Sequence, residues 1–220
     1  MLVYGDPQFQ ERLSGLVGTL RQRLRRTDRD DLEALRSLLI VAGQLEQGLQ
    51  DHWSGTAAPG VLQQSACATD LAAAAFHRAW HAASPQGPCE APDAEHLLEA
   101  LKEVLEGFPL DPDPVLTCKI PEGFAFYALF PEQYCASART WATAHAGRAP
   151  RRALVVGIRS IGTTLSALLK ATLEAAGWQS ERSTVRPGGH PYDRQVELSP
   201  AQAGSYPCAL VVDEGPGISG

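Results

Sequence analysis

The sequence predicts the α/β fold class, with a parallel-sheet domain over residues 115–220 and a mostly helical region over residues 1–108 before it. Residues 153–158 and 209–212 are short, unbroken apolar runs, the pattern of strands buried on both faces of a parallel sheet. In the first half, leucines and alanines instead recur at the spacing of amphipathic helices. Three prolines within residues 109–114 form a stiff connector, which is the expected domain boundary.

Four helices are expected in the first half, separated by breaks of Gly, Pro and Ser. They cover residues 8–25, 28–51, 61–83 and 93–107. The arginines at the end of the first helix are interpreted as a solvent-facing helix terminus. His77 and His81 would share one helical face but have no third ligand nearby, so a metal site is not expected there. Nothing in this region specifies chemistry.

The second half opens with residues 115–120 and 124–130, which we expect to pair as a hairpin through the turn at residues 121–123. Glu122, in that turn, is interpreted as a solvated residue. A helix is expected over residues 132–146.

Residues 152–178 predict a strand, a loop and a helix in succession. The strand covers residues 153–158, the helix covers residues 164–176, and the loop between them carries Arg159. The helix N-terminus attracts anions through its unpaired N–H groups and the helix dipole. The glycine spacing of this loop fits neither G-x-x-x-x-G-K-[ST] nor G-x-G-x-x-G.

A polar loop follows the next expected strand and carries Arg186, His190 and Arg194 among glycines and prolines. Three potential cations on a glycine-containing loop could close over a phosphorylated substrate. A plain hairpin between strands at residues 183–186 and 195–198 is the alternative interpretation.

Asp213 and Glu214 follow the last apolar run directly and precede a Gly-Pro-Gly-Ile-Ser-Gly loop. Ligands of open α/β sheets bind at the carboxyl ends of the strands. Paired acids and a glycine-rich turn at the end of a strand therefore suggest a site for a polyol or a phosphate.

With these segments together, residues 152–220 resemble the phosphoribosyltransferase family, which uses phosphoribosyl pyrophosphate (PRPP) and Mg²⁺. The resemblance rests on L-V-V-D-E-G-P-G-I-S-G at residues 210–220 and on V-V-G-I-R-S-I-G-T-T at residues 155–164. It implies that Asp213 and Glu214 bind the ribose hydroxyls. It also implies that the loop after these acids holds the 5′-phosphate and that the earlier loop holds the pyrophosphate.

The resemblance implies a catalytic set of Asp213, Glu214 and Arg159. The substrate-binding positions that it implies are Ser160, Gly162, Thr163, Arg186, His190, Arg194, Gly215, Gly217, Ser219 and Gly220. The implied cofactor is Mg²⁺, carried by the pyrophosphate and without a direct protein ligand. The implied partner is PRPP or a related phosphorylated sugar, and the acceptor of the phosphoribosyl group is not specified. The first 110 residues are expected to be a hood, a cap or a partner-binding module.

Two other functions are open. A non-catalytic regulator that senses PRPP or a nucleotide would keep the same site and use the helical region to bind a partner. The run D-E-G-P-G-I is also the glycine box of histidine-kinase-type ATPases, but that family needs an Asn-bearing helix and this chain has no Asn. The phosphoribosyltransferase family would continue into a helix after the acidic loop, so we expect the sequence to be a fragment of a longer protein.

Composition excludes several classes of partner. A net charge of −6 argues against a chain-wide nucleic-acid surface. No stretch approaches the ~20 apolar residues of a membrane span, and the N-terminus has no secretion signal. The five cysteines lack C-x-x-C spacing and are expected to be free thiols. We therefore expect a cytoplasmic protein that binds neither nucleic acid nor a membrane, and a homodimer is compatible with the sequence.

Overall fold

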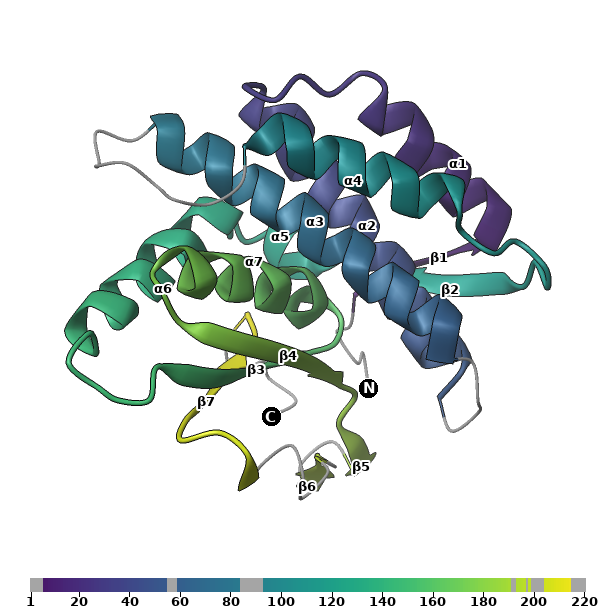
Figure 1. Ribbon diagram of the computed structural model, residues 1–220. Coiled ribbons are helices and arrows are strands. Elements are labelled where there is room, and N and C mark those ends of the chain that lie inside the picture. The colour runs from purple at the N-terminus through teal and green to yellow at the C-terminus, as the bar shows by residue number, and fades with distance from the viewer. Residues whose placement is uncertain are drawn as a thin grey trace. The chain divides into compact units, whose positions relative to one another are not determined.

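The computed structural model describes residues 6–54, 59–83, 93–190, 193–196, 198 and 204–214 (Figure 1). Over these residues the protein is a mixed α/β structure with seven helices and a parallel three-stranded sheet. The chain divides into two compact units. The helical unit comprises Gln8–Lys119, and the sheet unit comprises Met1–Pro7 and Ile120–Gly220.

The helical unit contains four helices and a two-stranded antiparallel sheet. Its elements are β1 (Gln8–Arg12), α1 (Leu13–Leu24), α2 (Leu32–His52), α3 (Pro59–Ala83), α4 (Ala94–Glu106) and β2 (Val115–Lys119). The four expected helices are therefore confirmed, with shifted ends. The second begins at Leu32 because the Asp31 carboxylate accepts the N–H groups of Glu33 and Ala34, at 3.1 and 3.0 Å, and caps the helix there.

Leucine is the commonest residue in the helical unit's buried core, as the helical spacing predicts. The fully buried leucines of its helices are Leu13, Leu20, Leu35, Leu38, Leu39, Leu45, Leu49, Leu101 and Leu105. Phe76 of α3 is also fully buried.

Strand β1 corrects the expectation of one continuous helix over residues 8–25. Its five residues pair antiparallel with β2, from Gln8 opposite Lys119 to Arg12 opposite Val115. The start of α1 is fixed beside this pair, because the N–H and the hydroxyl of Ser14 both donate to the Asp113 carboxylate at 2.8 Å. Pairing with a strand distant in sequence overrides the local helical spacing here.

The hairpin expected over residues 115–130 is wrong. The strand at its start is present as β2, but its partner is β1. Residues 122–125 instead form one helical turn, α5 (Glu122–Ala125), closed by N–H groups that donate to Pro121 and Glu122 carbonyls. The proline connector consequently lies inside the helical unit, and the chain passes between the units at Pro7–Gln8 and at Lys119–Ile120.

The sheet unit is built around three parallel strands in the order β4-β3-β7. Its further elements are α6 (Pro131–Ala144), β3 (Arg152–Ile158), α7 (Ile161–Ala175), β4 (Gln179–Val185), β5 (Gly188–His190), β6 (Asp193–Gln195) and β7 (Ala209–Val212). Helix α6 and strand β3 lie where the sequence predicts them. Strand β3 is central, and its five middle residues are buried, which confirms the expected buried strand.

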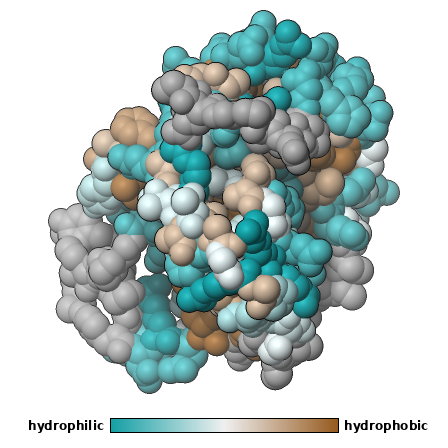
Figure 2. Space-filling view, turned by 60° about the vertical axis from the view of Figure 1, so that its left-hand side comes forward, coloured by the Kyte–Doolittle hydropathy of each residue, from teal (hydrophilic) through white to brown (hydrophobic). Residues whose placement is uncertain are grey.

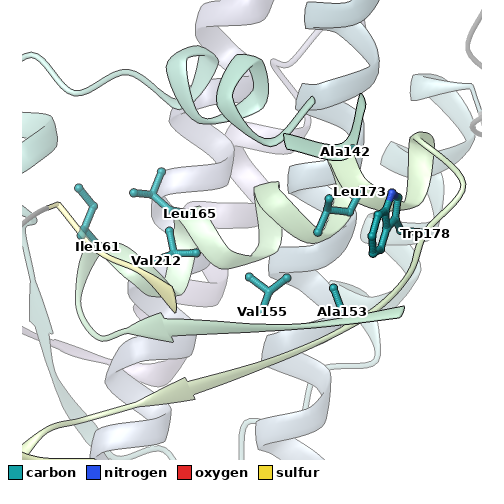
Figure 3. Packing of buried hydrophobic residues seen from close by; sticks show 8 residues of the cluster. All are labelled: Ala142, Ala153, Val155, Ile161, Leu165, Leu173, Trp178 and Val212. Carbon is teal, nitrogen blue, oxygen red and sulfur yellow. The ribbon is translucent and has the colours of Figure 1, made fainter. Parts of the chain in front are cut away.

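Helices α6 and α7 cover one face of this sheet (Figure 1). Figure 3 shows Ala153 and Val155 pointing from β3 toward Leu165 and Leu173 of α7. Trp178, just after α7, lies at one end of this cluster. On the opposite face, Leu154 and Val156 pack with residues that include Val185, Leu198 and Tyr206.

Strand β7 is present as predicted but is not buried on both faces. It pairs only with β3 in the described part of the sheet, from Ala209 opposite Leu154 to Val212 opposite Gly157. Val212 is buried, whereas Val211 is 67% exposed. The apolar run therefore marks an edge strand with one face on the core.

Helix α7 begins three residues earlier than expected, at Ile161. Gly162 and Thr163 accordingly belong to its first turn, not to a loop. The polar segment after β4 forms the small antiparallel pair β5–β6, from Gly188 opposite Gln195 to His190 opposite Asp193. A hairpin is thus present, but it lies between the two expected strands, because β4 ends at Val185.

Two buried thiols are expected to resist alkylation in the native protein. Burial is the main cause that raises the pKa of Cys118, in the helical unit, and of Cys135, in the sheet unit, each to about 12. Since the thiolate is the nucleophile, native Cys118 and Cys135 should react with iodoacetamide about tenfold or more slowly than the exposed Cys67. Peptide mass spectrometry after timed alkylation checks this. Equal labelling of the three thiols without denaturant would contradict the packing, and urea-unfolded protein provides the reference rates.

In the parts of the chain that the structure describes, no helix is long and apolar enough to cross a membrane.

Candidate functional site

The carboxyl edge of the β4-β3-β7 sheet brings together segments that are far apart in sequence. Residue 158, at the end of β3, pairs with residue 185 of β4, and residue 157 pairs with residue 212 of β7. The residues that follow these strands, Arg159, Arg186 and Asp213, therefore emerge at the same edge. In open parallel sheets this edge is where ligands bind.

The turn from β3 into α7 is packed tightly by two glycines. A Cβ atom on Gly157 would overlap the carbonyl of Gly162. A Cβ atom on Gly162 would lie 2.6 Å from the Val212 carbonyl oxygen of β7. Only glycine at these positions allows the N-terminus of α7 to approach both strands so closely.

Ser160 is the N-cap residue of α7, but its side chain does not cap the helix. Its carbonyl accepts the Thr163 N–H at 3.1 Å, and its hydroxyl donates to the Asp6 carboxylate. The Arg159–Ser160 peptide bond is cis. Thr163 itself is fully buried, and its hydroxyl has no hydrogen-bond partner among the described residues.

Arg159 and Arg186 make hydrogen bonds that connect the β3–α7 turn to the end of β4. The Arg159 N–H donates to the Val185 carbonyl at 2.9 Å. The Arg186 guanidinium in turn donates to the Arg159 carbonyl at 2.9 Å. Arg186 therefore holds the backbone of the turn from the β4 side.

The acidic pair lies on the side of β3 opposite to β4, and both residues are partly exposed to solvent. The Asp213 carboxylate accepts the Glu214 N–H at 2.8 Å, and the Glu214 carboxylate accepts the Gly123 N–H at 2.9 Å. The Tyr134 hydroxyl donates to the Asp213 carbonyl at 3.2 Å. The orientation of both acids is thus fixed by backbone and side-chain contacts.

The surroundings of the pair raise the pKa of both carboxyl groups. Partial desolvation is the main cause that raises the pKa of Asp213, the negative charge of Asp6 raises it further, and the positive charge of Arg194 opposes the rise. Desolvation also raises the pKa of Glu214, with contributions from the charges of Asp6, Asp213 and Glu122.

The pH dependence of stability follows from these directions. A raised carboxyl pKa means that the folded protein keeps protons which the unfolded chain has already lost, so stability falls as pH rises above the ordinary carboxyl value of about 4. The double variant Asp213→Asn, Glu214→Gln has no carboxyl groups at these positions and therefore does not lose this stability as pH rises. Its gain in unfolding free energy over the wild type should be larger at about pH 7 than at about pH 4. Urea unfolding at both pH values checks this, and a gain that is larger at the lower pH would contradict it.

Arg186, His190 and Arg194, which were predicted on one polar loop, lie on different parts of the segment after β4. Arg186 follows β4 and donates to the Arg159 carbonyl in the β3–α7 turn, and the charge of Arg194, on β6, acts on Asp213. His190 lies on β5, opposite Asp193, and is exposed. Gly215, Gly217, Ser219 and Gly220 lie outside the described residues, so the predicted phosphate loop has no structural description.

The structure adds three residues that the sequence did not single out for the site: Asp6, Gly123 and Tyr134. Asp6 contacts Ser160, whereas Gly123 and Tyr134 contact the acidic pair. Glu122 was expected to be a solvated turn residue, but it is half-buried, and its N–H donates to Asp6 at 3.0 Å. No motif marks these residues, because they come from segments far away in the chain.

Exposed aromatic residues lie close to this site in sequence. Phe126, Tyr127 and Phe130 are 66%, 61% and 47% exposed. They follow the α5 turn, whose Gly123 holds Glu214. Figure 2 shows that, on one face of the molecule, hydrophobic residues occur in small separate patches among hydrophilic ones.

Comparisons of the chain with models of known protein families, with curated protein sequences and with solved structures gave no match. No group of three or more His, Cys, Asp and Glu residues that could hold a metal ion occurs within the described segments.

Proposed function

We propose that the protein binds PRPP or a related ribose-5-phosphate ligand with Mg²⁺ at the carboxyl edge of the β4-β3-β7 sheet. In this proposal it transfers the phosphoribosyl group to an acceptor. The observation that carries the proposal is the juxtaposition of two turns: the acids after β7 lie beside the β3–α7 turn, with residues 157 and 212 in direct register. PRPP carries a pyrophosphate on C1 of its ribose and two free ribose hydroxyls. A site for it needs hydrogen-bond donors for the pyrophosphate beside hydrogen-bond acceptors for the hydroxyls.

Asp213 and Glu214 are the acceptors for the two ribose hydroxyls in this account. Their fixed orientation supports the role, because each carboxylate already accepts one backbone N–H and keeps further lone pairs for a ligand. Hydrogen bonds from hydroxyls to ionised carboxylates are stronger than neutral ones.

The β3–α7 turn would receive the pyrophosphate. A helix of 15 residues begins at this turn, so its first N–H groups and its dipole favour a negative charge there. Arg159 adds a full positive charge at the same end. When bound, Mg²⁺ would offset part of the charge of the leaving pyrophosphate.

Catalysis in this account is mostly electrostatic. Departure of pyrophosphate from C1 leaves an oxocarbenium-like ribose, and the positive groups of the turn stabilise the departing charge. The charge of Arg194, on β6, already acts on Asp213. In this proposal the β5–β6 pair covers the ligand and keeps water from the reacting carbon.

Calorimetric titration of the protein with PRPP and Mg²⁺ tests the proposal. We expect 1:1 binding, and pyrophosphate release when the correct acceptor base is added. Binding without release across a panel of purine and pyrimidine bases would favour a PRPP-sensing regulator. Binding of ATP and Mg²⁺ in place of PRPP would favour the ATPase alternative, and no binding of either ligand would reject the site.

A further inference from the structure

Asp6 connects two parts of the candidate site through hydrogen bonds. One oxygen of its carboxylate accepts the Glu122 N–H at 3.0 Å, and the other accepts the hydroxyl of Ser160. Asp6 is held in place by its neighbour, because the Pro7 carbonyl accepts the Ile120 N–H at 2.8 Å. One side chain near the N-terminus thus ties the turn at residues 121–123 to the turn between β3 and α7.

The next amide along the chain holds the acidic pair. Gly123 N–H donates to the Glu214 carboxylate at 2.9 Å. The consecutive N–H groups of Glu122 and Gly123 therefore bind two carboxylates that lie more than 200 positions apart in the sequence, those of Asp6 and Glu214. Ser160 and Glu214 are thus joined by three hydrogen bonds and by the peptide link between Glu122 and Gly123.

The packing around Gly123 leaves this connection little freedom. A Cβ atom on Gly123 would lie 2.6 Å from Ile161 Cδ1 of α7 and 2.8 Å from the Glu214 carboxylate. Gly123 is itself buried. A displacement of the turn would therefore move Glu214 or collide with the first residue of α7.

We propose that Asp6 is a positioning residue that fixes Ser160 and Glu214 relative to one another, so that the pyrophosphate and ribose parts of a ligand are bound together. This inference rests on the proposed function. Asp6 acts through its two neighbours and makes no contact with the ligand in this account.

If Asp6 acted only through its negative charge, its removal would change the ligand affinity in the opposite direction. The negative charge of Asp6 raises the pKa of both Asp213 and Glu214, and it would also repel a phosphorylated ligand. If repulsion dominated, removal of the charge would strengthen ligand binding. If positioning dominates, the same change weakens it.

The test uses Asp6→Asn in the full chain, with inorganic pyrophosphate and ribose 5-phosphate titrated separately by calorimetry in the presence of Mg²⁺. Asn keeps the shape of Asp but has only one oxygen to accept hydrogen bonds. We expect both affinities to fall by about 3- to 10-fold, which corresponds to the net contribution of one ordinary hydrogen bond. Ser160→Ala and Glu214→Gln identify which ligand reports on which end of the connection. Unchanged or tighter binding of either ligand by Asp6→Asn would overturn the inference.

A second pair of variants keeps the test valid if Asp6→Asn does not fold. Glu122→Pro removes the N–H that Asp6 accepts, and proline is tolerated at the first position of a helix, where Glu122 lies. Glu122→Ala removes the same carboxylate but keeps the N–H. We expect Glu122→Pro to bind both ligands about 3- to 10-fold more weakly than Glu122→Ala does. Equal affinities of the two variants would overturn the inference.

Two further readouts separate positioning from a general loss of structure. The effects of Asp6→Asn and Glu122→Pro on affinity should be less than additive, because both disrupt the same connection through residue 6. The pKa of Glu214, followed by NMR, should fall in the folded Asp6→Asn protein, because the charge of Asp6 raises it. Wild-type protein that binds neither ligand would reject the proposed function itself. Wild-type binding of both ligands, with Asp6→Asn equal to it, would reject only the role of Asp6.

Discussion

The double variant Asp213→Asn, Glu214→Gln is expected to bind PRPP at least about 100-fold more weakly than the wild type. Each carboxylate would lose a charge-assisted hydrogen bond to a ribose hydroxyl, worth about 1.5 kcal/mol or more. The substitutions keep the internal contacts, because the amide oxygens still accept the Glu214 and Gly123 N–H groups. Calorimetry with Mg²⁺ present measures the loss.

The matched control for this prediction is Glu174→Gln. Glu174 belongs to the same unit and is exposed, but it lies at the other end of α7, where it pairs with Lys170 at 3.0 Å. Its substitution should change the affinity for PRPP by less than about twofold, since exposed ion pairs contribute little. Retention of wild-type affinity by the double variant would remove the acids from the site. A similar loss in Glu174→Gln would indicate a nonspecific effect of charge.

Gly157→Ala is expected to lower the unfolding free energy by about 3 kcal/mol, the upper end of the usual range for overpacking. The added Cβ would overlap the backbone carbonyl of Gly162 and would lie 2.7 Å from the Ser166 hydroxyl oxygen. Backbone atoms cannot rotate away, so β3 and α7 must separate. Chemical denaturation followed by circular dichroism measures this change.

The same substitution should also affect the site. Because α7 begins just beyond the turn, its displacement moves Ser160 and Arg159, and pyrophosphate binding should weaken together with stability. Gly147→Ala is the matched control: it lies in the same unit, is exposed, and has no atom within 4 Å of the added Cβ. It should change the unfolding free energy by no more than about 0.5 kcal/mol. Equal effects of the two substitutions would contradict the close approach of β3 and α7.

The sheet core could be predicted because local pattern and tertiary role agree there. Residues 153–158 form an unbroken apolar run and lie in the central strand, and the amphipathic helix that follows covers the sheet. The acids after β7 were predicted for the same reason, since they directly follow an apolar run. The chain pairs these strands in parallel, so their ends meet where the general rule for α/β sheets places a ligand.

Other elements could not be predicted because tertiary contacts decide them. Phe9 belongs to a helical spacing in the sequence but lies opposite Cys118 in the β1–β2 pair. Residues 124–130 have the aromatic content of a strand, yet the chain folds back so that Leu129 N–H donates to the Gly123 carbonyl at 3.0 Å. In both cases the preference of a short segment is weaker than its long-range pairing.

The site residues that sequence reasoning missed are those that act through the backbone or across long distances in the chain. Asp6 lies 154 positions from Ser160, and only the fold brings them together. Gly123 contributes an N–H group, which every residue except proline carries, so its side chain gives no signal. A short acidic or glycine motif can be recognised in a sequence, whereas the contacts that orient it cannot.

The structure of a complex with PRPP and Mg²⁺ tests the central claim most directly. The account predicts that the two ribose hydroxyls lie within about 2.6–3.2 Å of the Asp213 and Glu214 carboxylates. It also predicts that the pyrophosphate lies at the N-terminus of α7, beside Arg159 and Ser160. A ligand bound at another edge of the sheet, or with its ribose turned away from both acids, would contradict the account.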